Sequence, residues 1–112
     1  MKLYVDDVRI PSDTGFENKE FCIARNWWQA VNIIKFAKPQ EIHFDHDLGD
    51  EHSHIRTGYG VAKFLIDQDQ YEKDDYITKD FKFFVHSANP VGKKNIEDLL
   101  NAYINQKFGK KK

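Results

Sequence analysis

The sequence contains a single cysteine, Cys22, among its 112 residues. One cysteine excludes an internal disulfide and any metal cluster built from several thiolates. The residues on either side of Cys22, Phe21 and Ile23, are apolar, so we expect a small buried side chain at this position. The lack of a disulfide framework is typical of proteins from a reducing compartment.

Long apolar runs and an excess of charge of one sign are missing too. No run approaches the ~20 residues that span a bilayer, and residues 1–7 lack the apolar region and cleavage site of a signal peptide. The 17 basic and 18 acidic residues nearly cancel, which gives no general attraction for nucleic acid or anionic membranes. We therefore expect a cytoplasmic protein with neither a membrane nor a nucleic acid as its partner.

The composition is sufficient for one folded domain. Hydrophobic residues make up 40% of the sequence and aromatic residues 14%, which predicts a globular fold rather than disorder. We expect a single domain over residues 1–106. Lysines gather in residues 107–112, so we expect a disordered basic tail there.

Short apolar segments alternate with segments of helical periodicity. The apolar segments predict strands over residues 3–6, 21–25, 41–45 and 82–85. Caps and periodicity predict helices from Asn26 to residue 37, over 58–67, and from Asn89 to residue 104. The core-facing stripe of the first helix should contain Trp28, Ala30, Val31, Ile33, Ile34 and Ala37. This alternation predicts an α/β fold: a three-layer α/β/α sandwich around a short, mostly parallel sheet of about four strands.

Polar side chains follow three of the predicted strands at the point where each strand ends. Asp6-Asp7 follow the first strand, Asp45-His46-Asp47 the third, and His86-Ser87-Ala88-Asn89 the fourth. Any one of these clusters could be a turn or a helix cap. Because the carboxyl ends of parallel strands meet at one edge of the sheet, where open α/β folds bind ligands, three such clusters favour a shared site.

Acidic residues dominate this expected site. Carboxylates of Asp6, Asp7 and Asp45 a few ångströms apart would repel one another by about 1–4 kcal/mol per pair, so the cluster favours a bound cation. All-oxygen ligands suit Mg2+, and Mn2+ fits as well if a histidine can reach. Whether Asp45 or Asp47 faces the site stays open, since one residue of register reverses the side-chain direction.

Histidine-based zinc binding is not favoured. The histidines in His52-Ser53-His54 do not have a recognised helical ligand spacing, and no His-Glu-x-x-His or paired-cysteine motif accompanies them. Gly58 and Gly60 form no phosphate-binding glycine pattern either, which argues against a nucleotide site of that kind.

The three clusters resemble those of the receiver domain of two-component signalling. Receivers have paired acids after the first strand, a phosphate-accepting aspartate after the third and a Ser/Thr-Ala pair after the fourth. Asp6-Asp7, Asp45 and Ser87-Ala88 match in order and context. The resemblance implies a truncated receiver (flavodoxin-like) topology. It also places Asp47 two residues beyond the acceptor, where its carboxylate would add a metal ligand.

Further motifs are similar to those of a compact receiver-like family, sometimes labelled cREC, which occurs in phages and bacteria and is linked to conflict systems. They are Asp6-Asp7-Val8-Arg9, Asp45-His46-Asp47-Leu48-Gly49, Thr57-Gly58-Tyr59 and His86-Ser87-Ala88-Asn89-Pro90-x-Gly92. The resemblance extends over residues 2–105. Two features depart from ordinary receivers: there is little room for a first helix, and no fifth strand carries a Lys-Pro. Lys93 or Lys94 would have to supply that cation.

The leading functional prediction is a receiver-like regulatory or interaction domain with a divalent-metal pocket. Asp45 would complete the metal site and accept a phosphoryl group from a donor. Ser87, Asn89 and Lys93 would contact phosphate or another anion beside the last helix. A protein partner is expected in this case.

Two alternatives stay open, so the sequence does not decide whether the chain is an enzyme. A metal-dependent phosphoesterase or nuclease would use the same atoms, with His46 or His86 moving protons and the loop over residues 50–57 acting as a lid. The catalytic candidates are then Asp45, His46, His86 and Ser87. The other alternative is an inert receiver-like adaptor that binds a protein partner through Trp27, Trp28 or the last helix.

Overall fold

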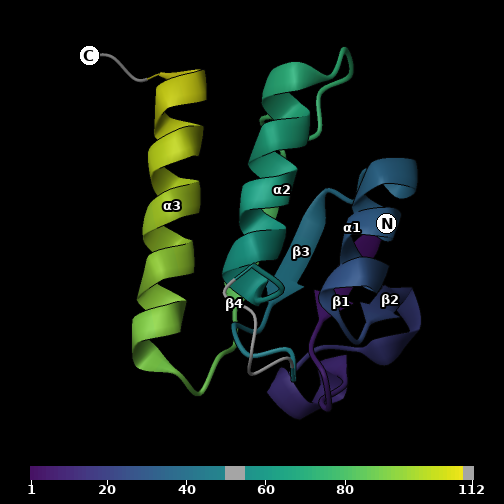
Figure 1. Cartoon of the computed structure of the whole chain (residues 1–112). Coiled ribbons are helices and arrows are strands. Elements are labelled where there is room, and N and C mark those ends of the chain that lie inside the picture. Colours follow the sequence, from purple (N-terminus) through teal and green to yellow (C-terminus); the bar gives the residue numbers. More distant parts are fainter. Residues whose placement is uncertain (50–54, 110–112) are drawn as a thin grey trace.

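A computed structural model describes residues 1–49 and 55–109 of the chain. In chain order its main elements are β1 (Lys2–Val5), β2 (Phe21–Ala24), α1 (Trp27–Ala37), β3 (Glu41–Phe44), α2 (Gly58–Tyr71), β4 (Lys82–Val85) and α3 (Pro90–Phe108) (Figure 1). Two 3-10 helices, η1 (Pro11–Thr14) and η2 (Asn18–Glu20), lie between β1 and β2. None of the helices in the described ranges is long and apolar enough to cross a membrane.

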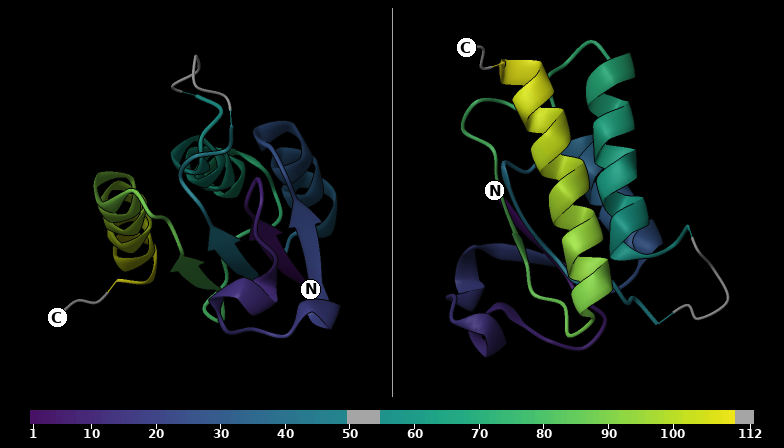
Figure 2. Two further views of the ribbon diagram at one scale, coloured as in Figure 1. Left: turned by 90° about the horizontal axis from the view of Figure 1, so that it is seen from below. Right: turned by 90° about the vertical axis from the view of Figure 1, so that its left-hand side faces the viewer.

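The four strands form one parallel sheet in the order β2-β1-β3-β4. The connections from β2 to β3 and from β3 to β4 advance in the same direction across the sheet. Parallel crossovers are right-handed, so α1 and α2 lie on the same face, and α3 packs beside α2 there (Figure 2). The connection from β1 to β2 runs in the opposite direction, which takes residues 6–20 over the other face.

The α/β class and the four-stranded parallel sheet are confirmed. The second outer layer differs from that of the expected sandwich, because η1 and η2 cover that face in place of an α-helix. Residues 8–20 lack helical periodicity and contain turn residues such as Pro11 and Gly15, whose φ of 90° ends η1. The sheet therefore has one helical cover and one thin, irregular cover.

Side chains alternate between the two faces of the sheet. The face toward the helices contributes six buried side chains to the main hydrophobic cluster, namely Leu3, Val5, Ala24, Ile42, Phe44 and Val85. The opposite face carries Tyr4, Phe21, His43 and Phe84, which we call the aromatic face. Phe16, from the segment between η1 and η2, covers it with its ring centroid 4.5 Å from that of His43.

The helix starts agree with the predicted caps, but one core assignment is wrong. Asn26 accepts a hydrogen bond from the Gln29 N–H at 2.9 Å, and Ala30, Val31 and Ile34 are buried as expected. Trp28 is 56% exposed and Ala37 is also exposed, so neither belongs to the core stripe. Trp27 packs against the core instead. Successive helical side chains point about 100° apart, so Trp28 turns outward.

Two helices are longer than predicted. The second helix ends at Tyr71 rather than at residue 67. The last begins as expected, with Asn89 accepting from the Gly92 N–H at 3.0 Å, but it continues to Phe108. Lys107 therefore lies in α3, in contrast to the expected tail from residue 107 onward. Residues 110–112 lie outside the described residues.

A buried carboxylate that the sequence analysis missed joins α2 to α3. Asp69 Oδ1 accepts from the backbone N–H groups of Tyr76 and Ile77, each at 2.9 Å. Its Oδ2 accepts from the Tyr103 hydroxyl at 2.6 Å and from Lys107 Nζ at 2.9 Å. Burial raises the pKa of Asp69, but these hydrogen bonds outweigh burial and hold it below its ordinary value.

Replacing this carboxylate tests its contribution to stability. We expect Asp69→Asn to lower the unfolding free energy by about 2 kcal/mol at pH 7, because Lys107 loses its partner. Because the pKa of Asp69 is lower in the folded than in the unfolded protein, its carboxylate stabilises the fold at pH values above the unfolded pKa. This stabilisation is lost as the pH falls, so the difference in unfolding free energy between variant and wild type should shrink below about pH 4. Urea unfolding of this variant and of the exposed control Asp67→Asn measures both effects. An equal loss in the two variants would contradict the prediction.

Candidate functional site

Three carboxylates meet at the carboxyl edge of the sheet. One oxygen from each of Asp6, Asp7 and Asp45 lies within 4.8 Å of the others. Asp6 follows β1 and Asp45 follows β3, and these neighbouring strands are held in register by the Asp45 N–H bonded to the Val5 carbonyl at 2.9 Å. Asp6 and Asp45 are buried and Asp7 is half-buried. The predicted acidic cluster is therefore present.

Within residues 1–49 and 55–109, Arg9 is the cation in contact with this cluster. Its Nε donates to Asp6 Oδ2 at 2.8 Å, and its Nη2 lies 3.7 Å from Asp45 Oδ1 and donates to the His86 carbonyl. The Arg9 side chain therefore connects the ends of β1, β3 and β4. One guanidinium cannot balance three carboxylates, so the cluster keeps a negative excess.

The loop after β1 is shaped by its own hydrogen bonds. Asp6 Oδ1 accepts from the N–H groups of Val8 and Arg9, at 3.0 and 2.9 Å. Arg25, at the end of β2, donates through Nη1 to the carbonyls of Asp6 and Arg9, at 3.2 and 2.6 Å. These contacts turn the chain back over the strand end and direct Arg9 at the cluster. In the sequence, Arg9 stands out only as part of a motif, and no pattern indicates Arg25.

The environment of Asp45 disfavours its charged form. Burial raises the pKa of Asp45 to about 6, and the neighbouring Asp6 acts in the same direction, while Arg9 and a hydrogen bond from Ser87 oppose the rise. A carboxyl with a raised pKa beside other carboxylates gains the most from a bound cation, which favours its ionised form.

The anion-binding candidates lie beside this carboxyl. Ser87 Oγ hydrogen-bonds Asp45 and accepts from the Asn89 N–H at 3.1 Å. The Asn89 side chain is used as the cap of α3, which leaves its amide nitrogen for other contacts. Lys93 is exposed on the first turn of α3, and Lys94 pairs with Asp98 at 2.9 Å. Arg9 therefore occupies the place near Asp45 that we expected Lys93 or Lys94 to fill.

Asp47 and His46 lie outside the acidic cluster. The Asp47 side chain is 65% exposed, and its Oδ1 lies 2.9 Å from His46 Nδ1. The sequence left open whether Asp45 or Asp47 faces the site, and it is Asp45 that lies with Asp6 and Asp7. The His46 ring packs against Gly92 of α3, where an added Cβ would lie 2.4 Å from its Cγ. His46 is thus fixed between the strand end and α3.

A cluster of His43, His86 and Glu41 was not anticipated. His43 Nδ1 lies 2.9 Å from His86 Nε2, and His43 Nε2 lies 2.8 Å from Glu41 Oε2. Burial, His43 and Arg9 lower the pKa of His86 to about 4, and burial also lowers the pKa of His43. The alternation of His43 with Ile42 and Phe44 was the only sequence signal for its place on the aromatic face. The predicted lid residues 50–54, with His52 and His54, lie outside the described residues.

Gly58 allows α2 to begin directly beneath the site. Its N–H donates to the His46 carbonyl at 2.7 Å, and a Cβ at this position would lie 1.9 Å from the Asp45 carbonyl oxygen. We expect Gly58→Ala to destabilise the fold by about 3 kcal/mol, because two backbone segments must separate. In the control Gly15→Ala, where only the positive φ is strained, the loss should be nearer 1 kcal/mol. Thermal unfolding that ranks them the other way round would refute this account.

The low pKa of His86 predicts acid sensitivity. An unfolded histidine titrates near pH ~6.5, whereas folded His86 resists protonation until about pH 4. Between these values the unfolded chain binds more protons, so the unfolding free energy should fall as the pH falls. We expect His86→Phe to reduce that slope. Proton NMR of the His86 ring measures the pKa directly, and a midpoint between pH 6 and 7 would be incompatible with the buried environment described above.

Comparison with known proteins gives the family. Residues 1–102 match the family described as the cyclic-phosphate processing receiver domain. No match was found among curated proteins or among solved structures. The matched region contains the four strands of the described part of the chain and the three strand ends that carry the acidic and histidine clusters. The compact receiver-like resemblance seen in the motifs is thereby confirmed. The chain belongs to the cyclic-phosphate processing receiver domain family.

Proposed function

We propose that this receiver-like domain hydrolyses a cyclic phosphate ester at a divalent-metal site formed by Asp6, Asp7 and Asp45. The observation that carries the proposal is the approach of three carboxylates within 4.8 Å, countered by the single guanidinium of Arg9. The family description adds the substrate class, a cyclic phosphate. The proposal therefore corresponds to the phosphoesterase alternative drawn from the sequence.

The residues present fit Mg2+ or Mn2+. The cluster offers only carboxylate oxygens, the ligands that Mg2+ prefers. Asp7 and Asp45 are the more available ligands, because both oxygens of Asp6 already accept hydrogen bonds from the loop. When bound, such a cation supplies Lewis acidity at a phosphoryl oxygen and lowers the pKa of a bound water.

The chain's own groups would bind and orient the ester. Arg9 presents a cation at the edge of the cluster, and a guanidinium suits the oxygens of a phosphate diester. Ser87 stands beside Asp45 and adds a hydroxyl donor, and Asn89 adds an amide next to the N-terminus of α3. His86 lies past the end of β4, close enough for its carbonyl to bond Arg9, and it is the candidate for proton transfer.

Phosphoryl transfer to Asp45, with a protein partner reading the result, is the second candidate. The hydrogen bond between Ser87 and Asp45 favours it, because receivers place a hydroxyl beside the acceptor aspartate. The two lysines on the first turn of α3 speak against it as the main activity. Lys93 is exposed and Lys94 pairs with Asp98, and in the described ranges neither contacts Asp45, where a receiver's lysine is expected.

Metal binding and turnover can be tested on the same samples. Amide NMR during a Mg2+ titration should show saturable shifts confined to residues 6–9, 45–47 and 86–87, and Asp45→Ala should weaken the binding at least about 10-fold. Hydrolysis of 2′,3′-cyclic AMP and 3′,5′-cyclic AMP with and without Mg2+ or Mn2+ measures turnover. We expect metal-dependent release of a phosphomonoester from at least one of them.

The matched control is Asp98→Ala, which removes an exposed carboxylate of α3 that pairs only with Lys94. It should bind metal and turn over as wild type does. If neither cyclic ester is cleaved, incubation with acetyl phosphate followed by mass spectrometry tests the second candidate through a phosphoryl adduct on Asp45. Amides that do not respond at millimolar Mg2+ would overturn the metal site itself.

A further inference from the structure

Three side chains on the aromatic face form a continuous hydrogen-bonded chain. Glu41 Oε2 lies 2.8 Å from His43 Nε2, and His43 Nδ1 lies 2.9 Å from His86 Nε2. Glu41 stands at the start of β3, His43 two residues further along, and His86 one residue beyond the end of β4. This hydrogen-bonded chain of side chains therefore runs from the amino edge of the sheet to the carboxyl edge, where Asp45 lies.

The middle of this chain is buried and rigidly packed. His43 is only 1% exposed and stacks on Phe84 with ring centroids 4.5 Å apart and an interplanar angle of 29°. Phe16 and Phe21 both meet the His43 ring edge-on, with ring centroids 4.5 and 4.9 Å from that of His43. An aromatic cage of this kind leaves the imidazole little rotational freedom, so its two hydrogen bonds keep their directions.

The carboxylate of Glu41 sets the position of each proton. A carboxylate only accepts, so His43 Nε2 carries the proton and donates to Glu41. His43 is only 1% exposed and His86 lies beside the Arg9 guanidinium, so both imidazoles are neutral, and a neutral imidazole has one N–H. His43 Nδ1 is then an acceptor, and His86 Nε2 must donate to it. The remaining nitrogen, His86 Nδ1, is left with a lone pair.

The position of His86 connects this chain to the acidic cluster. Its N–H donates to the Phe44 carbonyl at 2.8 Å, which continues the β3–β4 pairing by one residue and sets His86 beside Asp45 in the register. Arg9 contacts both the Asp45 carboxylate and the His86 carbonyl. Within the described ranges, His86 Nδ1 has no hydrogen-bond partner in the protein, so its lone pair is not used for folding.

We propose that Glu41 and His43 are positioning residues that hold His86 in the tautomer with a bare Nδ1, and that this nitrogen is the general base of the site. The inference rests on the proposed hydrolysis of a cyclic phosphate ester. Water adds at phosphorus and one ester P–O bond breaks. His86 Nδ1 takes the proton that water loses and returns it to the departing ester oxygen, so one water is consumed and one phosphomonoester is formed.

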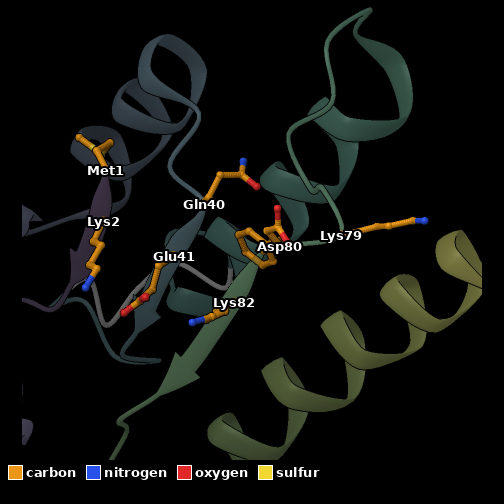
Figure 3. A pocket seen from close by; sticks show the side chains of 8 residues that line it. Met1, Lys2, Gln40, Glu41, Lys79, Asp80 and Lys82 are labelled. Atoms are coloured by element: carbon orange, nitrogen blue, oxygen red, sulfur yellow. The ribbon is translucent and has the colours of Figure 1, made fainter.

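At the opposite end of this hydrogen-bonded chain, the Glu41 side chain is 15% exposed. Glu41 lines a cavity of about 590 Å3 at the amino edge of the sheet, together with Met1, Lys2, Gln40, Lys79, Asp80, Phe81 and Lys82 (Figure 3). A buried histidine that served packing alone would need one partner for each nitrogen. Here the second partner is itself a histidine at the functional edge, an arrangement that resembles the orienting carboxylate and imidazole of hydrolytic triads.

The test first determines the tautomers of His43 and His86 and then measures the kinetics of cyclic-ester hydrolysis. Long-range 1H–15N correlation spectra of the full-length protein distinguish protonated from bare ring nitrogens. A scalar coupling between His86 Nε2 and His43 Nδ1 across the N–H···N bond identifies the chain itself. We expect bare Nδ1 atoms on both histidines at pH 7, and this coupling in the wild type. In His43→Phe, His86 should show averaged ring-nitrogen signals from two exchanging tautomers.

The kinetic comparison uses Glu41→Gln, with Glu20→Gln as the matched control. Glu20 is an exposed carboxylate at the same end of the sheet and pairs only with Lys2. We expect Glu41→Gln to lower kcat for the cyclic ester at least about 10-fold with KM changed less than about 2-fold, and Glu20→Gln to leave both unchanged. Circular dichroism confirms that both variants are folded.

The outcomes separate this inference from the function on which it rests. A protonated His86 Nδ1 in the wild type, or hydrolysis with an unchanged kcat in Glu41→Gln, would overturn the positioning role while the phosphoesterase proposal stands. The expected tautomer and coupling in a protein that cleaves neither cyclic ester would refute the hydrolysis and, with it, the role of His86 as its base. Only the expected spectra together with the kcat loss support the proposal.

Discussion

The contact between Arg9 and the acidic cluster holds the carboxyl edge of the sheet together. Three carboxylates at the ends of two neighbouring strands repel one another, and the guanidinium reaches Asp6, Asp45 and the carbonyl beyond β4 at once. Arg25 fixes the loop that presents Arg9. This arrangement offsets part of the repulsion while leaving a negative excess, which is the electrostatic condition for a divalent cation.

The thin cover over the aromatic face explains how a histidine pair can reach this edge. In an α/β sandwich with helices on both sides, both faces of the sheet are filled by apolar side chains. Here the segment with η1 and η2 supplies Phe16 above a face built from Tyr4, His43 and Phe84. An imidazole packs among aromatic rings much as another aromatic ring does. Both nitrogens of the buried His43 ring can be accommodated on this face because each has a hydrogen-bond partner. The loss of a helix thus creates space for polar chemistry.

Much of the fold could be predicted from the sequence because the signals were local. The caps at Asn26 and Asn89, the short apolar strands and the clusters at their ends each depend on neighbouring residues. The core side of α1 was misjudged because adjacent tryptophans fit a helical stripe about equally well, and only packing against Phe64 of α2 selects Trp27. The Asp69 network was missed for the same reason: its partners come from segments far apart in the chain. Arg9 and the hydrogen-bonded chain from Glu41 to His86 likewise depend on the pairing of strands that lie far apart in the sequence, which no local pattern encodes.

The central claim is that Asp6, Asp7 and Asp45 together bind one divalent cation. A crystal grown with Mn2+, measured on both sides of the manganese absorption edge, tests it most directly. We expect one anomalous peak with oxygens of Asp7 and Asp45 among its ligands, with Asp6 contacting the ion directly or through water and with Arg9 still bonded to Asp6. Saturating Mn2+ with no peak at this edge of the sheet, or a peak held by Asp47 and His46 alone, would contradict it.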